Sequence, residues 1–81
     1  MEYDFSKREV VIMNQEKLNR KIGQYLKAFR NRKGLSQTEV AESLELHQPA
    51  YSRIETGQQS LTAPQVWILM KQYGFRLGGV K

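Results

Sequence analysis

The sequence predicts an all-α protein, a small bundle of about four helices with an N-terminal arm and a short strand-like C-terminal tail. Apolar residues recur at helical spacing in several stretches between residues 15 and 73. These stretches are bounded by residues typical of helix caps: Ser or Thr with Glu or Gln three positions later, and glycine just past the last turn. A length of 81 residues allows one small domain. We therefore divide the chain into an arm (1–14), a helical domain (15–74) and a tail (75–81).

The arm shows no helical period and mixes charged residues with Tyr3 and Phe5. We interpret it as flexible. The run 10–13 favours β structure and fits either a short strand or an apolar segment that packs on the first helix.

The first helix is predicted from about Gln15 to Lys33, with Gly34 as its end. Its core stripe comprises Leu18, Ile22, Leu26 and Phe29. Gly23 lies inside this helix and costs up to about 1 kcal/mol relative to alanine. A close contact with another helix would account for it.

Two short helices follow, joined by a tight turn. Ser36 and Glu39 form a predicted capping box, so the second helix should begin at Gln37 and run for about two turns. The third is predicted from Gln48 to about Glu55. His47 is its possible N-cap, Pro49 lies in its first turn, and Gly57 is its C-cap.

The third helix has two distinct faces. Tyr51 and Ile54 lie three apart and can face the core. The other side carries Gln48, Pro49, Ser52 and Arg53. Hydrogen-bonding side chains near the start of a braced helix suit the reading of base edges in a major groove. The alternative is the solvated face of an ordinary surface helix.

Thr62 and Gln65 predict a second capping box, from which the fourth helix continues to Tyr73 with Gly74 as its end. One face is predicted to carry Val66, Leu69, Met70 and Tyr73. Trp67 belongs either to the core, which we favour, or to a subunit contact.

The tail is too short and glycine-rich for another helix. Phe75 and Leu77 alternate with Arg76 as in a half-buried strand. Its partner would be the run 10–13 or the same strand of a second subunit. A frayed tail is the alternative.

The formal net charge of +5 suits a polyanionic partner. Basic residues concentrate between positions 20 and 33, where no acidic residue occurs: Arg20, Lys21, Lys27, Arg30, Arg32 and Lys33. We expect an electrostatic footprint on the first helix and its C-terminal end, beside the third helix. A solvated helix face is the alternative.

The order and spacing of residues 34–41 and 44–57, with their glycine stops, closely resemble the phage-repressor and Cro-like (XRE-type) helix-turn-helix family. The resemblance covers about residues 18–75. It implies that 15–74 is a DNA-binding domain and that the protein is a sequence-specific transcriptional regulator. A repressor or autoregulator acting as a homodimer on a palindromic or near-palindromic operator is the main hypothesis. The alternative is a protein-interaction module on the same fold, such as an antitoxin paired with a toxin.

By this resemblance, the base-reading residues are Gln48, Pro49, Ser52 and Arg53. We expect contacts to DNA phosphates from Gln37, Arg30, Arg32, Lys33, His47 and Gln58. Arg30 and Glu55 match a family pair that ties the first helix to the end of the third. One departure is Glu45, at a turn position that the family usually fills with glycine. A left-handed backbone at this residue would cost roughly 1 kcal/mol.

Other classes of protein find little support. There is no cysteine, so disulfides and thiolate sites are excluded. His47 is the single histidine and has no partner in a catalytic motif, and neither zinc spacing nor a phosphate-binding loop occurs. We expect no enzymatic activity, cofactor or metal. No apolar run suggests a membrane span or secretion signal, so we expect a cytoplasmic, nucleoid-associated protein.

Overall fold

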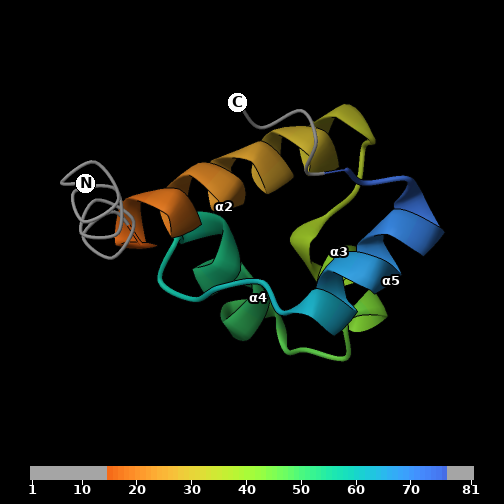
Figure 1. Ribbon diagram of the computed structural model, residues 1–81. Helices are drawn as coiled ribbons and strands as arrows, with labels where there is room; N and C mark the ends of the chain where they lie inside the picture. Colours follow the sequence, from red (N-terminus) through yellow and green to blue (C-terminus); the bar gives the residue numbers. More distant parts are fainter. Residues whose placement is uncertain (1–14, 77–81) are drawn as a thin grey trace, which may run out of the picture.

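The computed structural model describes residues 15–76 (Figure 1). They form four helices, α2 (Gln15–Arg32), α3 (Gln37–Ser43), α4 (Gln48–Thr56) and α5 (Ala63–Tyr73), and no strand occurs among them. The all-α prediction is therefore confirmed. The arm (1–14) and most of the predicted strand (77–81) lie outside the described residues.

Both predicted capping boxes are present. The Glu39 amide donates to Ser36 Oγ at 3.0 Å, while the Ser36 amide donates to Glu39 Oε1 at 2.8 Å. Thr62 and Gln65 make the same reciprocal pair at the start of α5. His47 occupies the N-cap position of α4, but its side chain makes no capping hydrogen bond. Pro49 instead favours this helix start through its fixed φ and its missing amide proton.

The long helix α2 lies across the top of the molecule in Figure 1, with α3 and α4 below it and α5 at the side. The helices enclose one core, which comprises Leu26, Phe29, Val40, Ala41, Leu44, Tyr51, Ile54, Leu69 and Phe75. Phe75 closes this core after α5, with its ring centroid 5.1 Å from Phe29 and 5.8 Å from Tyr25. The first residue of the predicted strand is therefore a core residue without strand pairing.

Three side chains expected in the core are exposed instead. Leu18 is 49% exposed, Trp67 59% and Met70 44%. Because a helix turns about 100° per residue, Trp67 lies on the side of α5 opposite the buried Leu69. Our interpretation of Trp67 as a core residue is wrong for this fold. Leu18 belongs to the first turn of a helix that is longer than the helices packed against it.

Candidate nucleic-acid interface

A tight turn sets the angle between α3 and α4. Glu45 has a positive φ of 59°, and the Leu46 amide donates to the Ala41 carbonyl at 2.8 Å. This is the left-handed helix end that glycine usually supplies. Glu45 thus adopts the strained conformation that its place in the sequence suggested.

Two glycines let α4 approach α2 closely. A Cβ atom at Gly23 would lie 2.5 Å from the Glu55 carbonyl oxygen and still closer to that of Ile54. A Cβ at Gly57 would lie 2.6 Å from Arg20 Cα. The close helix contact suggested for Gly23 is confirmed, and it brings the backbone at the C-terminal end of α4 against the middle of α2.

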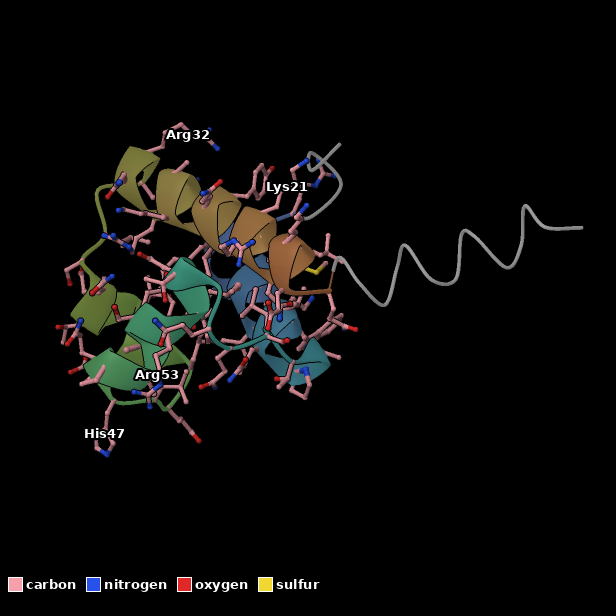
Figure 2. The ribbon with its side chains drawn as sticks, turned by 90° about the vertical axis from the view of Figure 1, so that its left-hand side faces the viewer. Lys21, Arg32, His47 and Arg53 are labelled. Atoms are coloured by element: carbon pink, nitrogen blue, oxygen red, sulfur yellow. The ribbon has the colours of Figure 1, made fainter. Side chains whose placement is uncertain are left out.

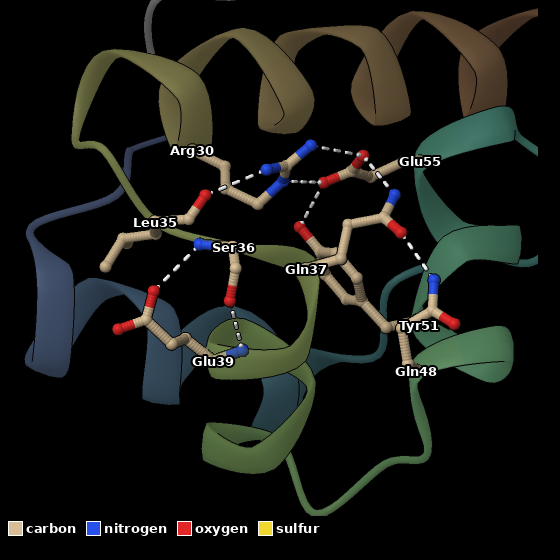
Figure 3. Close-up of polar contacts among 8 residues, drawn as sticks. All are labelled: Arg30, Leu35, Ser36, Gln37, Glu39, Gln48, Tyr51 and Glu55. Carbon is tan, nitrogen blue, oxygen red and sulfur yellow. Dashed lines mark hydrogen bonds and ion pairs between the residues drawn. The ribbon is translucent and has the colours of Figure 1, made fainter.

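A buried ion pair joins the same two helices (Figure 3). Arg30 Nε donates to Glu55 Oε2 at 2.6 Å, and its Nη2 donates to Oε1 at 3.3 Å. Arg30 Nη1 donates to the Leu35 carbonyl at 2.8 Å. The Tyr51 hydroxyl, one turn before Glu55 on α4, donates to Oε2 at 2.5 Å. Arg30 is 9% exposed and Glu55 4%, so the pair is held almost out of water.

The hydrogen bonds keep Glu55 ionised in this setting. Burial raises the pKa of the carboxyl, but the hydrogen bonds from Arg30, Tyr51 and Gln37 together outweigh burial and hold the pKa below its usual value. The hydrogen bond to Glu55 raises the pKa of Arg30. Burial, followed by the hydrogen bond to Glu55, raises the pKa of Tyr51. A fixed negative charge therefore lies directly behind the start of α3.

That charge orients a chain of side-chain amides that reaches the surface. A carboxylate only accepts hydrogen bonds, so Gln37 turns its amide nitrogen to Glu55, and Nε2 donates to Oε1 at 3.0 Å. Gln37 Oε1 then faces outward and accepts from Gln48 Nε2 at 2.5 Å. The remaining hydrogen-bonding capacity of Gln48 is its Oε1 atom and one N–H. Figure 3 shows these contacts, which run from Glu55 near the end of α4 to Gln37 on α3 and back to Gln48 at the start of α4.

The predicted base-reading residues share one face of α4. Gln48, Pro49 and Arg53 are exposed and Ser52 is half-buried, whereas Tyr51 and Ile54 on the other side are buried. In Figure 2, Arg53 and the neighbouring His47 point away from α2. The structure therefore brings together four side chains that together offer donors, acceptors and an apolar ring.

The predicted phosphate contacts are scattered. His47 and Gln58 are exposed near the two ends of α4. Arg30 is buried in its ion pair. Arg32 is exposed but lies at the opposite end of the molecule from Arg53 in Figure 2. Lys33 Nζ lies 5.6 Å from the centroid of the Phe29 ring. The expectation that the basic residues of α2 lie beside α4 is therefore wrong for Arg32.

The sequence did not predict one member of the polar network, Tyr51, or one of its contacts, between Gln37 and Gln48. Tyr51 was assigned to the core alone, although its spacing of four from Glu55 is that of side chains that meet on a helix. No sequence spacing predicts the contact between Gln37 and Gln48, because this contact depends on the angle between α3 and α4.

Other kinds of site find no support in residues 15–76. They contain no group of three His, Cys, Asp or Glu side chains that could hold a metal ion. None of the helices in this part of the chain is sufficiently long and apolar to cross a membrane.

Comparison with known proteins places the α3–turn–α4 unit in a family. A family model described as "Helix-turn-helix domain" matches residues 21–78, which is more than half of the chain. Searches of curated proteins and of solved structures found no match. The matched span begins within α2 and includes both helices of the unit and all of α5.

Proposed function

The chain belongs to the helix-turn-helix domain family, and from this premise we propose that it is a sequence-specific DNA-binding transcriptional regulator. We propose further that it is a repressor or autoregulator that acts as a homodimer on a palindromic or near-palindromic operator. The observation that supports this most is the exposed polar face of α4, where Gln48 is oriented through Gln37 by the buried Glu55. Such a regulator would work at the chromosome, in keeping with the expected nucleoid-associated location.

The free groups on α4 suit particular bases. Gln48 offers an acceptor and an N–H side by side, which matches N6–H and N7 of adenine in the major groove. The Arg53 guanidinium matches O6 and N7 of guanine, and Ser52 can bond to either kind of edge. Pro49 has no polar side-chain atom and suits contact with a thymine methyl group. Discrimination would thus rest mainly on Gln48, Ser52 and Arg53.

Phosphate contacts would fix the position of α4 without reading sequence. His47 and Gln58, near the two ends of α4, are suitably exposed for this role. Gln37 uses one amide N–H for Glu55 and has a second available for a phosphate. We leave Arg30 out of the proposed contacts because its guanidinium is held by Glu55 and the Leu35 carbonyl.

The exposed side of α5 supports association with another chain. Trp67 and Met70 lie about one turn apart on it, and both are exposed large apolar side chains that a partner chain could cover. A second copy of the protein on this side would give the homodimer. The same exposed side chains also support the alternative function, in which the protein is an antitoxin or another interaction module that binds a toxin. Co-purification of the product of a neighbouring gene would favour the alternative.

Fluorescence anisotropy tests the DNA-reading proposal. Labelled DNA from immediately upstream of the protein's own gene is compared with a scrambled duplex of equal length at two salt concentrations. We expect a preference of about a thousandfold or more that persists as salt rises, because base contacts depend less on counterion release than phosphate contacts do. Arg53→Ala should reduce this preference, whereas Arg76→Ala, which removes an exposed arginine far from α4 in sequence, should preserve it. Equal and steeply salt-dependent binding to both duplexes would contradict the proposal.

A further inference from the structure

A second charged surface lies on α2. Lys17, Lys21 and Arg32 are all exposed, and their spacing places them on the same side of the helix, which we call the outer α2 face. Gly23 and Arg30, which contact α4, lie on the other side of α2. Figure 2 shows Lys21 and Arg32 at the opposite end of the molecule from His47 and Arg53.

The charge of the protein is divided unevenly between α2 as a whole and the helix-turn-helix unit. Residues 17–33 contain seven Lys or Arg and no acidic residue: Lys17, Arg20, Lys21, Lys27, Arg30, Arg32 and Lys33. Within the described part of the chain, Arg30 is the one member of this set recorded in an ion pair. In contrast, residues 36–57 contain four glutamates and a single arginine. Most of the attraction to a polyanion therefore comes from α2 and not from the unit that would read bases.

The composition of the outer α2 face favours nucleic acid over a protein partner. The residues between its cations are small or polar, namely Gln24, Ala28 and Asn31, and all are exposed. Specific protein interfaces usually centre on aromatic or other large apolar anchors, which these residues do not provide. Lys17 and Arg32 are separated by about 22 Å along the helix axis. A duplex of that length carries on the order of thirteen phosphates, more than enough to face these cations.

We propose that the outer α2 face binds a second DNA duplex through its phosphates, without reading sequence, so that the protein can bridge two segments of DNA. In Figure 2, His47 and Arg53 point away from Lys21 and Arg32, so a straight duplex held by the exposed face of α4 would lie on the opposite side of the molecule from these two cations. The proposal rests on the proposed function only for the first duplex, which α4 holds. The second duplex needs only the cations of α2.

A bridging assay with the full-length protein tests this. Two short duplexes of unrelated sequence, one with a donor dye and one with an acceptor dye, should show energy transfer when the wild-type protein is added. Lys21→Gln/Arg32→Gln should weaken bridging by on the order of tenfold or more at physiological salt, because two phosphate contacts are lost. The matched control Arg76→Gln/Lys81→Gln removes one arginine and one lysine that lie far from α2 in sequence and should leave bridging unchanged.

The outcomes separate this proposal from the function of α4. If both double variants bridge as well as the wild type, any bridging comes from the α4 faces of a dimer, and the proposal is overturned. Absence of bridging by a wild-type protein that binds single duplexes overturns it as well, while leaving the regulator intact. Loss of sequence preference in the anisotropy experiment would instead count against the proposed function. Charge-matched poly-glutamate should compete more weakly than duplex DNA, and equal competition would indicate an acidic protein as the partner.

Discussion

Substitutions in the Arg30–Glu55 pair provide the sharpest test of what holds α4 in place against α2. In Glu55→Gln, the amide keeps one oxygen as an acceptor but turns an NH2 group toward donors. In the wild-type protein the carboxylate accepts four hydrogen bonds, from Arg30 Nε and Nη2, from Gln37 and from Tyr51. The substitution also leaves the Arg30 cation, 9% exposed, without its counter-ion.

The expected decrease in the free energy of unfolding is large compared with the total stability of a small domain. Removing one partner of a buried ion pair costs about 3–5 kcal/mol. A domain of this size has a total stability of about 4–12 kcal/mol. Arg30→Met should cost a similar amount, because it leaves the Glu55 carboxylate buried without its cation. The double variant should cost less than the sum of the two, since neither charge then remains alone.

Urea unfolding measures these differences, and urea is preferable to guanidinium because it does not screen charge. With a denaturant slope of about 1 kcal/mol per molar, a loss of about 3–5 kcal/mol in Glu55→Gln should lower the midpoint by about 3–5 M or leave the protein unfolded. Glu42→Gln, at an exposed glutamate on α3, is the control and should change stability by about 0.5 kcal/mol or less. Single variants that each cost under about 1 kcal/mol and add without coupling would refute the reasoning.

Three further predictions concern stability and are checked by the same unfolding measurement. Because the pKa of Glu55 is lowered in the folded state, its contribution is present above the ordinary glutamate pKa and is lost as pH falls through the folded value. We therefore expect the free energy of unfolding to decrease as the pH falls below about 5. Tyr51→Phe should make this decrease smaller, because it removes one hydrogen bond that favours the ionised carboxylate. A pH profile that is the same in the variant as in the wild type would count against this. Gly23→Ala should destabilise by at least about 1 kcal/mol, since the new Cβ meets backbone that cannot rotate away, whereas Gln24→Ala on the exposed side should be nearly neutral; similar results for both would contradict the close packing. Glu45→Gly should stabilise by up to about 1 kcal/mol by relieving the positive φ, and a loss of stability would show that this turn is not strained.

Features with a local signal could be predicted from the sequence. The capping boxes at Ser36 and Thr62 depend on residues three positions apart, and both occur. The glycine inside α2 and the non-glycine residue at Glu45 each suggested a backbone feature that the structure shows. Helix positions and ends followed for the same reason, because periodicity and caps act within a few residues.

Features that depend on how helices pack could not be predicted in the same way. Helix α5 is apolar around much of its circumference, so periodicity placed Leu69 correctly on the core face but did not show that Trp67 and Met70 are exposed. The run of basic residues in α2 showed how many positive charges this helix carries but not which side of the helix each one occupies. Arg32, for example, lies away from α4 (Figure 2). The contact between Gln37 and Gln48 arises only once α3 and α4 cross.

The central claim is that the exposed face of α4 reads DNA sequence, and selection from a pool of randomised duplexes tests it most directly. The wild-type protein should enrich two related half-sites whose centres lie about one helical turn apart. Arg53→Ala should lose the preference at one position in each half-site and retain it at the others, because other side chains on α4 still contact their bases. Enrichment of no sequence by the wild type, or an unchanged site for Arg53→Ala, would contradict the account.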